Sequence, residues 1–328
     1  MIDRRGLVAL AACGVLGWHR GATAQSASKP WRIGFLTGGP RPADAAPPAA
    51  LRQALLTLGY VEGKDIVFES RWGEVRNERL PVLAAELVAL KPDVLLTTGG
   101  PSAAAAKQAS LTTPVVVVTA GDVVETGLAA SLARPGGNVT GVNDPAAVLS
   151  AKRLEMIKEL VPAARRVAVL WNPGDQAMTL RYRAIERAAQ ILNVVIDPLG
   201  VREPDDFGTA LAVMGRTRPD ALMMVSDALT TLNRQKVIDF AAAQRIPAMY
   251  EFAATVKAGG LMSYGSDVNE LFTIMASYVD RILKGAKPAD LPVEQPNRYL
   301  LVINFKTAKA LGITVPQTLL VRADEVIQ

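Results

Sequence analysis

Cysteine and histidine are almost absent from this chain of 328 residues, which contains one of each, Cys13 and His19. Both lie in the first 24 residues, which have the pattern of a removable leader. Without them the remaining chain cannot build a Ser-His-Asp or Cys-His nucleophile, thiol redox chemistry, or a zinc or copper site of histidine and cysteine. We therefore expect no metal and no cofactor. Carboxylate, lysine and tyrosine chemistry stay available, but the loss of the commonest general base argues against an enzyme.

The first 24 residues have a basic start at Arg4 and Arg5, an apolar middle and a small-residue end. This order is typical of a secretory signal, and we expect export to the periplasm. Two alternatives stay open for the route. The stretch DRRGLV (3–8) resembles a twin-arginine export signal, against an ordinary basic start. The stretch LAAC (10–13) resembles a lipoprotein box that would acylate Cys13, although it comes very early. The apolar run is too short to make a good membrane span.

The chain also lacks a strong excess of either charge. The formal net charge is +5, and removal of the leader lowers it to +3. The basic residues are scattered among acids, so the sequence shows no nucleic-acid-binding face. Half of the residues are hydrophobic and a fifth are charged, which is the composition of a globular protein with room for one large or two medium domains.

Apolar runs alternate with helical patterns along two stretches of the chain. The expected strands are 31–36, 65–72, 93–98, 114–120, 165–172, 193–199, 219–227 and 246–252. The expected helices are 47–61, 77–92, 101–110, 124–137, 177–192, 204–217, 232–245 and 266–285. Strands that are apolar throughout are typical of parallel sheets covered by helices on both faces. The sequence therefore predicts an α/β fold with two open parallel sheets, each of domain size.

Small and polar residues gather where the expected strands end. In open parallel sheets, ligands bind outside the carboxyl ends of the strands. The clearest corner is TTGGPS (97–102), where glycine allows close approach and the start of a helix leaves backbone N–H groups free to bind an anion. A ligand carboxylate can accept hydrogen bonds there; the alternative is a plain strand-to-helix turn.

Four other candidates each carry an alternative role. Asp122 and Asp227 can contact a ligand, Asp227 through a ligand ammonium group, or can cap the helices that follow them. Tyr250 and Tyr264 can stack on a ligand or belong to the core. The spacing of Asp122, Asp227 and Glu251 gives little support to an acid/base pair or a magnesium site. The full set of expected ligand-binding residues is Thr37, Gly38, Thr98, Gly100, Pro101, Ser102, Thr119, Asp122, Asn143, Asp227, Tyr250, Glu251, Tyr264 and Asp267.

Several stretches resemble one family, most specifically LARPGGNVTG (132–141) and LKGAKPADLPVEQP (283–296). The resemblance extends over nearly all of the chain after the leader. The family is that of the ABC transporter substrate-binding proteins of the tryptophan/phenylalanine-binding-like type. Asp227 and the pair Tyr264-Gly265 match the family's pattern. The corner at 97–102 departs from the family's pattern, with Gly100 in place of a threonine or serine before Pro101.

The resemblance implies a type I periplasmic binding protein with two Rossmann-like lobes joined by a multi-strand hinge. We expect one lobe at 30–142 plus 266–293 and the other at 143–265 plus 294–328. The hinge is expected near 140–145, 264–267 and 294–297. The implied function is the capture of a small carboxylate-bearing ligand, an amino acid or aromatic acid, for an ABC permease in the inner membrane. We expect the protein to act as a monomer.

Two other functions stay open. A ligand-sensing module for a membrane receptor would have the same export signal and the same lobes. A carboxylate- or lysine-based enzyme can also use this scaffold, although the missing histidine and cysteine disfavour it.

Overall fold

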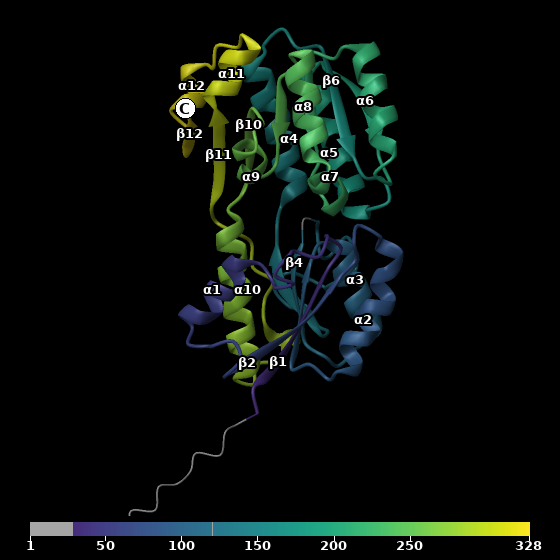
Figure 1. Ribbon diagram of the computed structural model, residues 1–328, viewed down its shortest axis with the longest axis vertical. Helices are drawn as coiled ribbons and strands as arrows, with labels where there is room; N and C mark the ends of the chain where they lie inside the picture. Colours follow the sequence, from purple (N-terminus) through teal and green to yellow (C-terminus); the bar gives the residue numbers. More distant parts are fainter. Residues whose placement is uncertain (1–28, 120) are drawn as a thin grey trace, which may run out of the picture.

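The computed structural model describes residues 29–119 and 121–328 of the chain. The leader expected at residues 1–24 lies outside the described residues. The described elements form two α/β lobes, each built on one sheet, and the lobes stand one above the other in Figure 1. No helix among the described residues is long and apolar enough to cross a membrane.

The first sheet has five parallel strands in the order β2-β1-β3-β4-β5. These are β1 (Trp31–Thr37), β2 (Ile66–Trp72), β3 (Val94–Thr98), β4 (Val115–Thr119) and β5 (Val139–Asn143). One face packs on α2 (Leu80–Ala89) and α3 (Gly100–Ala109). The other face packs on α1 (Ala49–Thr57) and α10 (Val268–Leu283). Both faces are covered, which explains why the inner strands β1, β3 and β4 are largely apolar, whereas the edge strand β2 contains Glu69, Ser70 and Arg71.

The second sheet has seven strands in the order β12-β11-β10-β9-β8-β6-β7. Neighbouring strands pair in parallel except β10 and β11, which are antiparallel to each other. The strands are β6 (Arg166–Trp171), β7 (Val195–Gly200), β8 (Ala221–Met224), β9 (Ala248–Tyr250), β10 (Met262–Ser266), β11 (Tyr299–Asn304) and β12 (Glu325–Ile327). The helices of this lobe are α4 (Ala146–Leu160), α5 (Gln176–Leu192), α6 (Asp206–Thr217), α7 (Ala228–Leu232), α8 (Arg234–Gln244), α9 (Ala253–Lys257), α11 (Phe305–Leu311) and α12 (Gln317–Leu320). Helices α4 and α5 bury one face of the sheet, and α6 and α8 bury the other.

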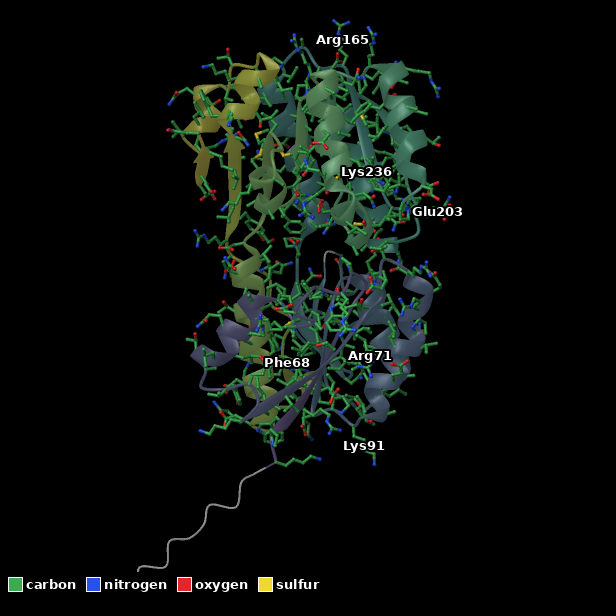
Figure 2. The ribbon with its side chains drawn as sticks, in the orientation of Figure 1. Phe68, Arg71, Lys91, Arg165, Glu203 and Lys236 are labelled. Atoms are coloured by element: carbon green, nitrogen blue, oxygen red, sulfur yellow. The ribbon has the colours of Figure 1, made fainter. Side chains whose placement is uncertain are left out.

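All strands of the first sheet, and β6 to β10 of the second, run toward the space between the lobes. Lys91 precedes β3 and Arg165 precedes β6, and Figure 2 shows these two side chains at opposite ends of the molecule. The carboxyl ends of the parallel strands therefore face each other across the middle, where open parallel sheets bind ligands.

The chain passes between the lobes after β5, after β10 and before β11. Two of these passages are joined by backbone hydrogen bonds, from Asn143 N to the Glu294 carbonyl (2.8 Å) and from Glu294 N to the Gly141 carbonyl (3.0 Å). The Asp267 N–H donates to the Arg298 carbonyl (3.1 Å). The division of lobes at 142–143, 265–266 and 293–294 remains our proposal, and the packing of α10 on the first sheet supports it.

One expected helix is wrong. Residues 124–137 form turns, because the Asp122 carboxylate accepts from the N–H groups of Val124 and Glu125 and holds a single turn. Gly127 then takes a left-handed φ of 72° and ends that turn. The segment that follows forms β5 and α4, two elements that the sequence patterns did not predict.

Candidate functional site

A cavity of about 670 Å³ lies between the two lobes and is lined by residues from both. It opens at the carboxyl ends of β1, β2, β3 and β4 on one side and at the starts of α5 and α7 on the other. Its volume falls within the range of small-molecule sites, roughly 300–1,000 Å³.

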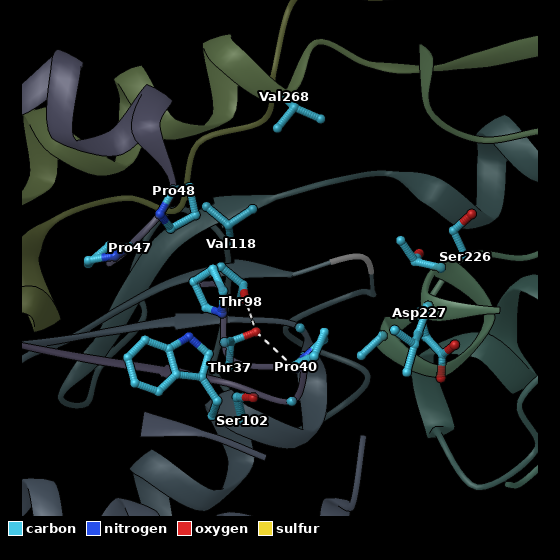
Figure 3. A pocket seen from close by; sticks show the side chains of 18 of the residues that line it. Thr37, Pro40, Pro47, Pro48, Thr98, Ser102, Val118, Ser226, Asp227 and Val268 are labelled. Atoms are coloured by element: carbon cyan, nitrogen blue, oxygen red, sulfur yellow. Dashed lines mark hydrogen bonds between the residues drawn. The ribbon is translucent and has the colours of Figure 1, made fainter. Parts of the chain in front are cut away.

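The wall on the first lobe offers hydrogen-bond donors. The Thr98 hydroxyl donates to the Thr37 hydroxyl (2.7 Å), as Figure 3 shows, and the Gly39 N–H donates to the same oxygen (3.3 Å). The hydroxyl proton of Thr37 is therefore left for a ligand. Beside this pair, α3 begins without a side-chain cap. Its second and third residues, Pro101 and Ser102, line the cavity. The free N–H groups of this helix start favour an anion.

The chain reaches that helix start through Gly99, whose φ is 85°. A residue with a Cβ atom rarely adopts this left-handed conformation, so glycine is needed for the turn. The second glycine of the corner, Gly100, is the first residue of α3 and does not line the cavity.

The wall on the second lobe carries carboxylates. Asp227 lies across the cavity from the Thr37–Thr98 pair in Figure 3. Its Oδ1 accepts from Thr230 N (2.8 Å), which caps α7, and its Oδ2 accepts from Asn172 Nδ2 (2.7 Å). Asp227 therefore caps a helix and also lines the cavity, where it can contact a ligand. The Thr230 hydroxyl also donates to Oδ1 (2.9 Å), so Oδ2 is the oxygen that keeps capacity for a further donor.

A second carboxylate, Asp175, lies on the same wall and caps α5 by accepting from Ala177 N (2.9 Å). Burial raises the pKa of Asp175, and the charge of Asp227 raises it further, while the Ala177 N–H and Arg181 lower it. Two carboxylates that repel each other at a cavity wall are suited to hold a cation, which would relieve the repulsion.

Ser226 precedes Asp227 and also lines the cavity. It is 4% exposed, and within the described part of the chain its hydroxyl has no hydrogen-bond partner. A buried hydroxyl without a partner costs free energy, and a ligand group could satisfy it.

Alongside the charged side chains of Asp44, Arg52 and Arg234, apolar side chains line much of the remaining cavity. They come from the ends of strands, from α10 and from the proline-rich loop before α1: Phe35, Pro40, Pro42, Pro47, Pro48, Trp72, Val118, Phe252, Val268, Leu271 and Phe272. Such a surface favours an apolar or aromatic ligand group.

A buried ionic network lies behind the second wall. Glu251, 1% exposed, is paired with Arg153 (2.8 Å) and with Arg181. Arg181 Nη2 is 4.0 Å from the carboxylate of Asp144, which lines the cavity. The Ser266 hydroxyl donates to Asp144 (2.9 Å). Burial raises the pKa of Asp144, and Arg181, Arg153 and the Ser266 hydroxyl lower it.

Six of the residues expected from the sequence line the cavity, and they are Thr37, Gly38, Thr98, Pro101, Ser102 and Asp227. Thr119 ends β4, and its side chain lies outside what the structure describes. The remaining expected residues are placed elsewhere.

Each of these displaced residues has another task. Asp122 is exposed and caps a turn, and Asn143 accepts from Val123 N (3.0 Å). Tyr250 belongs to the core between the second sheet and helices α6 and α8, and its pKa is raised by burial. Tyr264 packs near Tyr299, and Asp267 caps α10 by accepting from Asn269 N (3.0 Å).

Sequence patterns missed several lining residues, above all Asp175, Trp72 and Phe252. Asp175 had a usable signal, because an aspartate directly before a helix is a common cap and helix starts lie at strand ends. Trp72 had a weaker one, as the last residue of an expected strand. Nothing in the sequence distinguished Phe252 from a core residue.

A cavity between two α/β lobes that the chain connects three times defines a two-lobed ligand-binding protein, with the fold of type I periplasmic binding proteins. The family model of the ABC transporter substrate binding protein matches residues 42–327. The chain therefore belongs to that family.

Known proteins agree with this assignment. A tyrosine-binding protein of Clostridioides difficile is 26% identical over 262 residues, which are 80% of this chain and 75% of that protein. A Streptococcus pneumoniae ABC domain in complex with L-Trp is 25% identical with a TM-score of 0.83, covering 91% of this chain and all of the other. A conserved domain protein from Vibrio cholerae is 26% identical with a TM-score of 0.84 and the same coverage.

Proposed function

We propose that this protein is the extracytoplasmic solute-binding component of an ABC uptake transporter. It captures a small carboxylate-bearing ligand, an amino acid or aromatic acid, and releases it unchanged. It works as an exported monomer in the periplasm and delivers its ligand to an inner-membrane permease. The observation that carries the proposal is that the Thr37–Thr98 hydroxyl pair and the start of α3 on one lobe line the same cavity as Asp227 and Asp175 on the other.

The two walls suit the two ends of an amino acid. Its carboxylate accepts from the Thr37 hydroxyl and from the start of α3 at Ser102, and its ammonium lies against Asp227 and Asp175. Its side chain occupies the apolar surface around Trp72. A ligand held in this way touches both lobes, so it favours the state in which they are closed. The relatives whose names record tyrosine and L-Trp support an aromatic side chain.

A thermal-shift screen tests this function. The panel contains L-tyrosine, L-tryptophan, L-phenylalanine, aliphatic amino acids and aromatic acids without an amino group. At least one compound should raise the melting temperature, since a ligand at 100 times its Kd stabilises the native state by about 2.7 kcal/mol. Mass spectrometry of the bound compound should recover it intact. A panel without any shift would refute the ligand class, and a chemically altered compound would refute a binding role.

The affinity for an amino-acid ligand should fall as the pH is lowered. An ordinary aspartate has a pKa of about 3.9. The pKa of Asp175 is raised, so this carboxyl takes up a proton at a higher pH than an ordinary aspartate does. The ligand ammonium requires the ionised form, so binding releases a proton and weakens as the pH falls through the raised pKa. Among the neighbouring charges, Asp227 raises the pKa of Asp175 and Arg181 lowers it.

Titration calorimetry at pH 7 and below, in two buffers of different ionisation enthalpy, measures the released proton. In Asp175→Asn the amide oxygen can still cap α5, so this variant should bind more weakly at pH 7 and lose most of the pH dependence. An unchanged pH profile in the variant would show that Asp175 does not face the ligand's charge.

A further inference from the structure

We propose that Gly121 and Ala177 are positioning residues that set how far the two lobes close, and thereby the ligand affinity, without touching the ligand. The inference rests on the proposed function for its link to affinity. Its structural part, the limit on closure, can be tested without any ligand.

The space at Gly121 is the first observation. Gly121 follows β4 in the first lobe, and Ala177 lies in the first turn of α5 in the second lobe. A Cβ atom on Gly121 would lie 2.5 Å from the Ala177 Cβ and 3.3 Å from its Cα. One added carbon has no room between the lobes here, so the absence of a side chain at this position permits their close approach.

A second contact joins the lobes at Gly38 and Ala228. A Cβ atom on Gly38 would lie 3.8 Å from the Ala228 Cβ, which is ordinary van der Waals contact. Among the glycines that the structure describes, Gly38 and Gly121 would each bring an added Cβ within 4 Å of the other lobe, and of these two only Gly121 lacks the room for it. Gly121 is thus the position where a small change in side chain would hold the lobes apart.

Both contacts lie next to a cavity carboxylate. Ala177 N donates to Asp175, and Ala228 directly follows Asp227. If the start of α5 moves away from the first lobe, Asp175 moves with it, because the aspartate caps that helix. The distance between the lobes at Gly121 therefore sets the distance across the ligand, between the start of α3 and the carboxylate wall.

Disulfide trapping measures closure directly. In a Cys13→Ser background, Gly38→Cys and Ala228→Cys place two Cβ atoms 3.8 Å apart, close to the mean of about 3.8 Å for disulfides. The rate of disulfide formation in oxidised glutathione then reports how often the lobes reach this contact. Adding Gly121→Val should slow the reaction about tenfold or more, since overpacking by added carbons destabilises the packed state.

Matched variants separate closure from folding. Gly137→Ala lies in the same connecting region, where an added Cβ meets nothing within 4 Å, and it should leave the trapping rate unchanged. Gly121→Ala should slow trapping less than Gly121→Val, and Ala177→Gly should restore part of the rate in combination with Gly121→Ala. The melting temperature of each variant is measured in parallel, and Gly121→Ala is the decisive variant if Gly121→Val does not fold.

The same variants without the cysteines are titrated with L-tryptophan and L-tyrosine. Gly121→Ala should weaken whichever of them binds, by a similar factor to its loss of trapping rate. Unchanged trapping in both Gly121 variants would overturn the inference and leave the proposed function standing. Slowed trapping that no amino or aromatic acid accelerates would support the inference and count against the proposed ligand class.

Discussion

Asp227→Asn should lower the affinity for an amino-acid ligand by about 30- to 5,000-fold, which corresponds to about 2–5 kcal/mol for one partner of a desolvated charge pair. The substitution removes the negative charge that we place against the ligand ammonium. The amide oxygen can still accept from Thr230 N, so the cap of α7 is retained, although the contact with the Asn172 amide is weakened. Calorimetry with the ligand found in the thermal-shift screen measures the effect.

Asp220→Asn is the matched control. Asp220 precedes β8, at the opposite end of the strand from Asp227, and accepts from the N–H groups of Arg165 and Arg166. An asparagine oxygen can accept in the same way, so the affinity should stay within about twofold. If Asp227→Asn also binds within twofold of the unchanged protein, the ligand does not place a cation at this wall, and an aromatic acid without an amine becomes the better ligand.

The strand–helix alternation was predictable because helices cover both faces of each sheet and bury its inner strands. This makes the apolar runs continuous and easy to recognise. The direction of β1 to β10 then places their carboxyl ends at the cavity side of each lobe. Thr37, Thr98, Ser102 and Asp227 were found by that rule alone, without knowledge of how the lobes face each other.

The same rule fails where a strand end turns into its own lobe. Glu251 follows β9 as Asp227 follows β8, but its carboxylate pairs with Arg153 from α4 and Arg181 from α5. These partners are about 100 and 70 residues away in the chain. The local sequence contains no sign of such distant partners. Tyr250 lies in the core for a similar reason, because its side chain points to the face that α6 and α8 cover.

The composition of the cavity wall depends on the placement of two lobes, which no local pattern specifies. Asp175 lines the cavity because α5 begins beside the first lobe, and Trp72 lines it because β2 ends below the same opening. The segment 124–137 has helical composition, but capping by Asp122 and the left-handed Gly127 end its only turn. Local hydrogen bonds and backbone conformation there outweigh propensity.

Glu251→Gln should cause the largest loss of stability of the variants considered. Glu251, Arg153 and Arg181 are each at most 2% exposed, so the ion pairs lie in a medium that hardly screens charge. Burial lowers the pKa of Arg153, and the Glu251 carboxylate opposes this effect. Removing one partner of a buried pair leaves an uncompensated charge and costs about 3–5 kcal/mol. For a chain of this size we expect the melting temperature to fall by about 10 °C.

Glu155→Gln is the matched control, since Glu155 forms a 2.7 Å pair with Lys152 in which both side chains are nearly half exposed. Exposed pairs contribute about 0–1 kcal/mol, so the melting temperature should change by a few degrees at most. Glu251→Gln should also weaken the ligand moderately, because Arg181 is adjacent to Asp144 and to the Ser226 carbonyl of the cavity wall. If both glutamine variants melt alike, the buried arginines do not depend on the Glu251 charge, and the network cannot be what holds the second wall in place.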